Sequence, residues 1–242
     1  MRMISLARLT RCPCRGTSRA ARFRPLIAHG VAPGLFHSTF HMVRPQPDLI
    51  LASSSEIRAR LLAQAGLHVA VRPVRVDEET IRASLQSEGA GPRDIADALA
   101  EAKARRVRDA GDAMVLGADQ ILELDGRIFA KPESPEDACA HLRLLSGRTH
   151  RLVSALVVLR EGEPIWRHVA QVRLKMHPLS DSFITDYVAR NWHSIRHAVG
   201  CYKLEEEGVR LFAGIQGDYF AILGLPLIEF LTWLHARGDI TT

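Results

Sequence analysis

Several polar and charged side chains of this sequence follow apolar segments, at positions where strands of a sheet would end. They are Ser53, Ser55 and Arg58 after residues 49–52, Glu78 after 74–76, Asp119 after 114–118 and Lys131 after a hairpin, with Lys103 in a helical pattern. Because ligands of open α/β sheets bind at the carboxyl ends of the strands, we expect these side chains to converge if the strands are neighbours. The cations and serine-capped N–H groups suit phosphates, and the two carboxylates suit a divalent cation or an activated water.

Hydrolysis of a phosphoanhydride needs both kinds of group. Cations hold the charge that develops on the phosphates, and a carboxylate places or deprotonates the attacking water. The residue types therefore predict a nucleotide hydrolase. The sequence contains no Walker A loop, GxGxxG run, GxSxG elbow or HExxH pair, so the commoner motif classes are unsupported.

Each of these residues also has a purely structural explanation. The serines could cap a helix, Asp119 could belong to a turn and Lys103 could be a solvated charge. His193 and His197 have the i, i+4 spacing of metal ligands on a helix, but no third ligand is near them in the sequence. A surface pair is therefore the favoured interpretation of these two histidines.

Strand and helix patterns alternate along the chain, which predicts one α/β domain. Apolar runs and alternation predict strands at 49–52, 69–76, 114–118, 152–159 and 165–176, and a hairpin of 120–124 with 127–130 around Asp125-Gly126. Helical spacing and capping signals predict helices from Ser55 to Gly66, at 92–108, from Ser134 to Gly147, at 180–190 and at 226–237.

The net charge of +5 comes entirely from the N-terminus. Residues 1–44 contain eight arginines and no acidic residue, which leaves 24 basic against 27 acidic residues, or −3, for residues 45–242. We expect residues 1–46 to be an Arg-rich leader that is not part of the fold. Three interpretations of it stay open: translation that begins at Met42, a disordered basic tail, or an organellar transit peptide.

The rest of the composition indicates a cytoplasmic protein. The sequence has no apolar stretch of the 18 or more residues that a membrane-spanning helix needs, so we expect no membrane partner. Its four cysteines are too few for a disulfide framework, and Cys12 and Cys14 lack CxxC spacing. These features favour a reducing compartment.

The segment LILASSSEIR at 49–58 resembles LILAS-x-S-P-R-R, the N-terminal signature of the Maf family of nucleoside triphosphate pyrophosphatases. Further motifs fall in the family's order: VDE at 76–78, LAEAKA at 99–104, GAD at 117–119, DG at 125–126, KP at 131–132, LSGRTH at 145–150, GDY at 217–219 and GLPL at 224–227. Each motif is weak alone, but the whole set in register is specific. The match spans about 47–237.

This resemblance implies hydrolysis of a nucleoside triphosphate between the α and β phosphates, which releases a monophosphate and pyrophosphate with a divalent metal, Mg²⁺ or Mn²⁺. It implies that Asp119 is the proton acceptor and a metal ligand with Glu78. It also implies that the phosphates contact Ser53, Ser55, Arg58, Lys103 and Lys131. The implied fold is one elongated α/β domain at 47–240, similar to ITPase, with a mixed twisted sheet, two lobes and a cleft between them, usually as a homodimer.

Three positions bear on which nucleobase the substrate carries. Gln120 and Glu205 resemble the 7-methyl-GTP branch of the family, and a carboxylate at 205 could accept hydrogen bonds from a guanine N1–H and amino group. Ile57 replaces that branch's tryptophan, so a cationic base would lose its aromatic partner. A rival hypothesis is a non-catalytic regulator that binds nucleotides or nucleic acid and is linked to septum formation. The paired carboxylates favour the enzyme, for which no stable nucleic-acid partner is expected.

Overall fold

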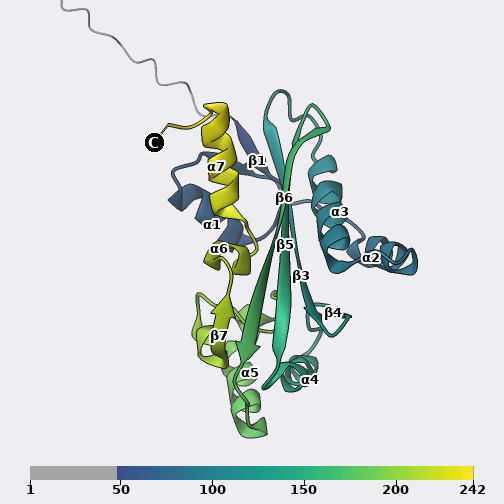
Figure 1. Ribbon diagram of the computed structural model, residues 1–242, viewed down its shortest axis with the longest axis vertical. Helices are drawn as coiled ribbons and strands as arrows, with labels where there is room; N and C mark the ends of the chain where they lie inside the picture. Colours follow the sequence, from purple (N-terminus) through teal and green to yellow (C-terminus); the bar gives the residue numbers. More distant parts are fainter. Residues whose placement is uncertain (1–47, 242) are drawn as a thin grey trace, which may run out of the picture. The chain divides into compact units, whose positions relative to one another are not determined.

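A computed structural model describes residues 48–241, which belong to one compact unit of the chain, residues 43–242 (Figure 1). The leader expected at residues 1–46 lies outside the described residues. In the described part, the structure is mixed α/β, as the sequence predicts. No helix there is long and apolar enough to cross a membrane.

The sheet has seven strands in the order β2-β1-β3-β5-β6-β7, and the short β4 pairs with β3. The strands are β1 (Leu49–Leu51), β2 (Val69–Val71), β3 (Met114–Leu124), β4 (Arg127–Phe129), β5 (Thr149–Arg160), β6 (Glu163–Met176) and β7 (Phe212–Gln216). The strand β1 is parallel to β2 and β3, whereas all other pairs are antiparallel. The sheet is therefore mixed.

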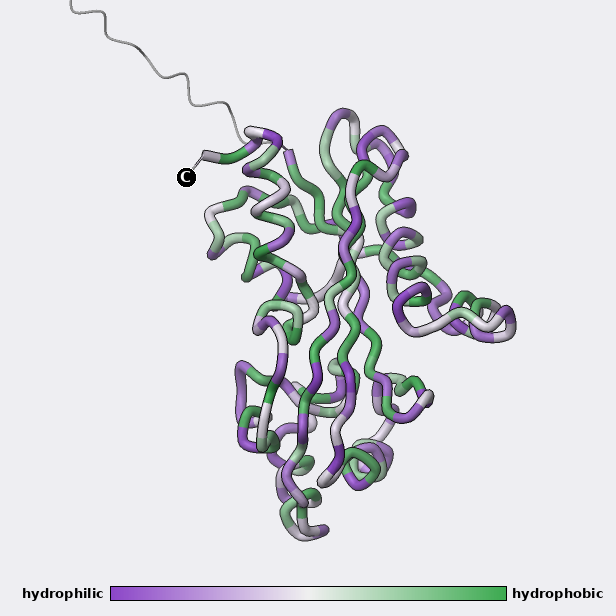
Figure 2. The backbone as a smooth tube through the Cα atoms, viewed as in Figure 1, coloured by the Kyte–Doolittle hydropathy of each residue, from purple (hydrophilic) through white to green (hydrophobic). Residues whose placement is uncertain are grey.

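Helices cover both faces of the sheet (Figure 1). They are α1 (Glu56–Gln64), α2 (Glu78–Ser87), α3 (Pro92–Arg105), α4 (Pro135–Leu145), α5 (Asp181–Ile195), α6 (Tyr219–Ile222) and α7 (Leu227–Arg237), with a 3₁₀ helix at Glu207–Leu211. Helix α3 packs on one face, where Ile50 and Val115 contribute to its core. Helices α1, α4, α5 and α7 pack on the other, with Leu51 and Leu116. The strands β1 and β3 are therefore buried on both faces of the sheet, and the apolar character of the central sheet is visible in Figure 2.

Of the three helix starts predicted to have a serine cap, two have the capping hydrogen bond. The Ser134 hydroxyl accepts a hydrogen bond from Asp137 N–H, and Ser180 accepts one from Phe183 N–H, as predicted. Ser55 occupies the N-cap position of α1, as predicted, but its side chain makes no capping hydrogen bond. Instead, the Ser53 hydroxyl accepts from the backbone N–H of Ser55 at 3.2 Å.

The structure corrects three predicted elements. The strand expected at 69–76 ends at Val71, because it pairs only with the three residues of β1 and Pro73 has no N–H to donate. Residues 78–87 form α2, which was not predicted, so Glu78 begins a helix and does not follow a strand. The segments 114–118 and 120–124 are one strand, so Asp119 lies within β3 and not after it.

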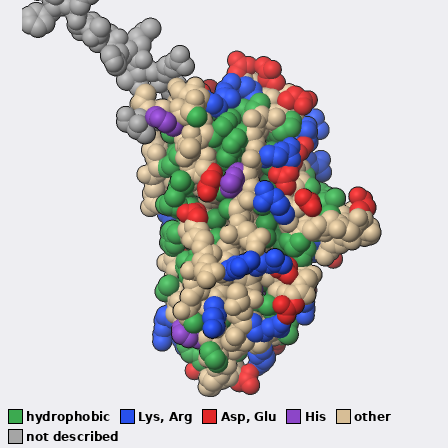
Figure 3. Space-filling view, in the orientation of Figure 1, with side chains coloured by type: hydrophobic (Ala, Val, Ile, Leu, Met, Phe, Trp, Pro, Cys, Tyr) green, Lys and Arg blue, Asp and Glu red, His purple; other side chains and the backbone are tan. Residues whose placement is uncertain are grey.

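Charged side chains of both signs are interspersed on the face drawn in Figure 3. Exposed ion pairs join some of the charged side chains of residues 48–241, among them Arg105 with Glu101 at 2.7 Å and Arg190 with Glu207 at 2.9 Å. Such exposed pairs each add little to stability. The mixture does show that this face carries no continuous cationic surface.

Candidate active site

The candidate site lies beside a stretch of β3 that has a strand partner on only one of its two edges. One edge of β3 pairs with β5 throughout this stretch. On the other edge, β1 pairs with residues 114–116 and β4 with residues 122–124, which leaves residues 117–121 without a partner there. Side chains alternate along a strand, so Asp119 points to the α3 face and Gln120 to the opposite face. Because the edge between β1 and β4 is open, both side chains line the same cavity of about 960 Å³.

The site residues predicted from the sequence all line this cavity. They are Ser53, Ser55, Ile57, Arg58, Glu78, Lys103, Asp119, Gln120, Lys131 and Glu205. The predicted reason for their convergence holds for the turn after β1, because β1 is parallel to its neighbour β3. It is wrong for Asp119, which lies within β3, and for Glu78, which begins a helix. The gap in strand pairing brings them together.

Lys103 links two of the acidic residues that line the cavity. Its Nζ atom lies 2.5 Å from Asp119 Oδ1 and 2.8 Å from Glu78 Oε1. Lys103 and Asp119 are mostly buried, whereas the Glu78 side chain is 44% exposed. Helix α3 supplies the lysine, β3 the aspartate and the first turn of α2 the glutamate. Three separate elements therefore build one charged cluster.

The two carboxylates have pKa values displaced in opposite directions. Burial raises the pKa of Asp119, and the negative charge of Glu78 adds to this, although Lys103 and Arg58 oppose it. Partial burial also raises the pKa of Glu78, but the nearby cations, Lys103 first, outweigh it and the net shift is downward. Burial thus makes Asp119 a stronger proton acceptor than an ordinary aspartate, which is the direction that a general base requires.

Arg58 is buried behind this cluster and is held mainly by backbone oxygens. Its Nε donates to Gly224 O at 2.7 Å, and its Nη1 donates to Ala118 O at 2.9 Å and to Ser53 Oγ at 3.3 Å. Burial lowers the pKa of Arg58, and the charges of Asp119 and Glu78 oppose this. Arg58 therefore ties the β1–α1 turn to β3 and contributes positive charge to the floor of the cavity.

At the other end of the cavity, Gln120 has a fixed orientation. Its Nε2 lies 2.9 Å from Ser154 Oγ, 3.1 Å from Ala221 O and 2.9 Å from Ile222 O. Backbone carbonyls can only accept, so the amide nitrogen must face them. The carbonyl oxygen of Gln120 is then the atom left for a ligand, and it can only accept.

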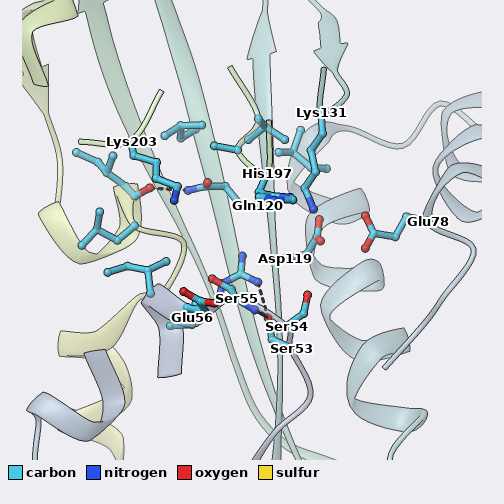
Figure 4. A pocket seen from close by; sticks show the side chains of 18 of the residues that line it. Ser53, Ser54, Ser55, Glu56, Glu78, Asp119, Gln120, Lys131, His197 and Lys203 are labelled. Carbon is cyan, nitrogen blue, oxygen red and sulfur yellow. Dashed lines mark hydrogen bonds between the residues drawn. The ribbon is translucent and has the colours of Figure 1, made fainter. Parts of the chain in front are cut away.

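The Figure 4 view shows how the labelled side chains lie along the cavity. Lys203 and Glu78 are on opposite sides, and Gln120 and Asp119 lie between them. Lys203 donates to Glu206 at 3.3 Å. Asp119, Glu78 and Lys131 thus mark one end of the site, and Gln120 and Lys203 mark the other.

Two groups of lining residues were missed or set aside by sequence reasoning. His193 and His197, interpreted as a surface pair, are exposed but line the cavity. Burial lowers the pKa of His197, and so do Arg196, Lys131 and Lys203. Arg82 was missed because α2 was missed, although Asp77 accepts from Thr80 N–H in an N-cap pattern that the sequence displays.

The donor atoms of the cavity suit a hard divalent cation. Lys103 contacts one oxygen of each carboxylate, and within residues 48–241 the second oxygens, Glu78 Oε2 and Asp119 Oδ2, have no protein partner. In the same residues, no group of three or more His, Cys, Asp and Glu side chains is placed to hold a metal. Two carboxylates with substrate phosphates and waters are a usual Mg²⁺ ligand set.

Comparison with known proteins gives consistent results. The model of the family described as "Maf-like protein" matches residues 48–237. A "nucleoside triphosphate pyrophosphatase" of Ruegeria pomeroyi is 58% identical over 195 residues, which cover 80% of this chain and 98% of that protein. A "7-methyl-GTP pyrophosphatase" of Rhizobium meliloti is 46% identical over 196 residues, 81% of this chain and 98% of that protein.

Among solved structures, a nucleoside-triphosphatase / dITP/XTP pyrophosphatase from Mycobacterium abscessus is similar over 78% of this chain and 94% of its own. The TM-score is 0.35 and the sequence identity is 14%. A likeness at this level carries no argument about the site.

Proposed function

The chain belongs to the Maf-like protein family, and from this premise we propose that it hydrolyses nucleoside triphosphates to nucleoside monophosphates and pyrophosphate. It is a hydrolase of nucleotide metabolism with a housecleaning role. The observation that carries the proposal is the cluster of Lys103, Asp119 and Glu78 in a cavity whose floor also contains Arg58. The names of the two relatives, a nucleoside triphosphate pyrophosphatase and a 7-methyl-GTP pyrophosphatase, agree with it.

The proposed reaction uses a carboxylate as the proton acceptor and cations to bind the phosphates. Asp119 accepts a proton from a water, whose oxygen attacks the α-phosphorus as the bond to the bridging α–β oxygen breaks. Pyrophosphate leaves with the bonding electrons, and Asp119 then returns the proton to solvent. Lys103 holds Asp119 in place, and the cations Arg58 and Lys131 offset the negative charge on the phosphates.

Glu78 and Asp119 would hold a divalent cation, Mg²⁺ or Mn²⁺. When bound, such a cation supplies charge neutralisation and Lewis-acid polarisation of the phosphates. Ser53 and Ser55 contribute their hydroxyl groups at the β1–α1 turn, where the Ser53 hydroxyl accepts from Arg58 and from Ser55 N–H and can still donate its own hydrogen.

The end of the cavity that contains Gln120 and Lys203 is suited to a nucleobase that donates hydrogen bonds. Gln120 offers a carbonyl oxygen, and Glu205 is a half-exposed carboxylate that lines the same cavity. A guanine edge supplies N–H donors for both. Ile57 gives no aromatic face for a methylated, cationic base, so we propose that guanine is recognised whether or not N7 is methylated.

The test is a panel of nucleoside triphosphates, including GTP and 7-methyl-GTP, with pyrophosphate and orthophosphate measured separately. We expect pyrophosphate as the product, and a loss of about 10²–10⁴ in turnover for Asp119→Asn, the usual contribution of a general base. Release of orthophosphate alone, or full turnover in Asp119→Asn, would contradict the mechanism. A homodimer and a cytoplasmic location stay predictions.

A further inference from the structure

The cations already assigned to the cavity have few donors left for a polyphosphate. Arg58 uses Nε and Nη1 on the protein, and a Cβ at Gly224 would lie only 2.9 Å from its Nη2, which shows how closely that nitrogen is packed. Lys103 uses two of its three N–H groups on Asp119 and Glu78. A triphosphate needs more donors than these two side chains have free.

Three other cations line the cavity without an ion pair or hydrogen bond to the protein within residues 48–241: Arg60, Arg82 and Lys131. Lys131 already has a proposed contact with the phosphates. Arg60 lies on α1 and is exposed, whereas Arg82 is half-buried. Arg82 is therefore the less exposed of the two arginines, and with no ion pair or hydrogen bond within residues 48–241 its guanidinium is free to bind a ligand of the cavity.

The position of Arg82 points to a particular part of the substrate. It lies four residues after Glu78 on α2, so both side chains share one face of the helix, one turn or about 5.4 Å apart. Glu78 is on the side of Asp119 away from Lys203, the base end (Figure 4). Arg82 thus lies one helical turn from Glu78 and lines the same cavity, and Glu78 is at the end away from Lys203 (Figure 4).

We propose that Arg82 binds the β and γ phosphates, the part of the substrate that leaves as pyrophosphate. This inference rests on the proposed function and adds a substrate-binding residue to it. An arginine can hold phosphate oxygens through two parallel N–H groups, which a lysine cannot do. Glu79 lines the same end of the cavity, but it is exposed, so water and salt screen its repulsion of the phosphates.

The test compares Arg82→Ala and Arg82→Lys with Arg75→Ala in the full-length chain. Arg75 is a matched control, because it is an exposed arginine three residues before Glu78 that does not line the cavity. The readouts are KM for the triphosphate, and inhibition constants for inorganic pyrophosphate and for the monophosphate product.

We expect Arg82→Ala to raise KM and the inhibition constant for pyrophosphate by about tenfold or more, the scale of a charge-assisted hydrogen bond. The inhibition constant for the monophosphate should not change, and Arg82→Lys should recover part of the loss. An unchanged pyrophosphate constant, or equal losses for both products, would overturn the proposal.

Calorimetric binding of inorganic pyrophosphate to the wild type and Arg82→Ala separates this inference from the proposed function. If the wild type hydrolyses no triphosphate, the proposed function fails, yet weaker pyrophosphate binding in the variant still supports Arg82. If the wild type is active and both proteins bind pyrophosphate equally, only the assignment of Arg82 fails.

Discussion

At the scale of single residues, the proton affinity of Asp119 depends on two neighbours with opposite charges. Lys103, at 2.5 Å, lowers the pKa of this buried carboxyl, while Glu78 on the other side of the lysine raises it. A general base works only when ionised, so activity should fall as the pH drops through the raised pKa of Asp119. In a plot of kcat/KM against pH, the acidic limb is the part where activity falls as the pH drops. The pH at which this limb lies therefore depends on the charges around Asp119.

Removing each neighbour should move the acidic limb of kcat/KM in opposite directions. Glu78→Gln removes a negative charge, lowers the pKa of Asp119 and should shift the limb to lower pH. Lys103→Gln removes a positive charge and should shift it to higher pH. Lys175→Gln on β6, which is exposed and does not line the cavity, is the control for the loss of a lysine. Shifts in the same direction would contradict the assignment of Asp119 as the base.

Residue types and motif order were enough to predict side chains that line one cavity, but not how these side chains interact. The sequence placed Lys103 among the phosphate contacts, and nothing in its helical spacing indicates that its ammonium joins Glu78 to Asp119. The link needs α2 to bring Glu78 to α3, and α2 was not predicted. Helix α2 is amphipathic, and its apolar residues Ile81 and Leu85 pack on the α3 side of the sheet. Their i, i+4 spacing is therefore a helix signal that the sequence contains.

At the scale of elements, Gly117 determines how closely α3 approaches β3. A Cβ at this position would lie 2.0 Å from the backbone oxygen of Ala100 and 2.9 Å from Ala104 Cβ. Both contacts flank Lys103 on α3. Since neither a backbone oxygen nor a helix-packed alanine can move freely, the glycine sets the distance between the helix and the strand that carries Asp119.

Gly117→Ala should therefore damage both stability and activity. We expect the free energy of unfolding to fall by about 1–3 kcal/mol, as overpacked cores usually show, and kcat/KM to fall because Lys103 is displaced from Asp119. Urea denaturation and pyrophosphate release, measured where the variant is folded, check the two effects. Gly214→Ala on β7 is the matched control, since nothing lies within 4 Å of its Cβ. Equal stability of the two variants would show that α3 can shift without cost.

A second element, β5, holds the segment after α5 through His150. This side chain is 1% exposed, and its Nε2 lies 2.7 Å from the hydroxyl of Tyr202, which lines the cavity. Burial lowers the pKa of His150 to about 4 from 6.5. Between these values the unfolded chain binds a proton that the folded protein does not, so the folded state loses stability as the pH falls from 6.5 to 4.

The shift corresponds to about 3 kcal/mol at the acid end of this window, at about 1.4 kcal/mol for each pKa unit. His150→Gln cannot titrate, so its free energy of unfolding should change less than that of the wild type between pH 7.5 and pH 4.5. Urea titrations at both pH values measure this difference. His235→Gln, at an exposed position of α7, should keep the wild-type dependence. A variant with the wild-type slope would mean that His150 does not cause the acid sensitivity.

At the scale of the whole chain, the elements were predicted better than their pairing. Local capping and periodicity were enough for α3, α4, β5 and β6, since neighbouring residues determine these signals. The gap between β1 and β4 depends on which strands pair over which residues, and a periodic pattern contains no such information. The open edge of β3 at residues 117–121, which creates the site, therefore became visible only in the structure.

The charge distribution bears on the rival hypothesis of a nucleic-acid-binding regulator. Residues 45–242 carry 24 basic and 27 acidic residues, and both signs are mixed on the face in Figure 3. Binding to nucleic acid requires several cations on one surface, with an affinity that falls steeply as salt rises. In the sequence, residues 1–44 hold eight arginines and no acidic residue.

Deleting residues 1–41 should therefore separate the two activities. We expect the full chain to bind a DNA duplex weakly, with a steep dependence on salt, because its N-terminal arginines release counterions. The shortened chain should lose this binding and keep the wild-type kcat/KM for the triphosphate, since every proposed site residue lies at or after Ser53. Fluorescence anisotropy at several salt concentrations, with pyrophosphate release on the same samples, measures both. Salt-dependent DNA binding that survives the deletion would place the nucleic-acid site within residues 42–242 and favour the regulator.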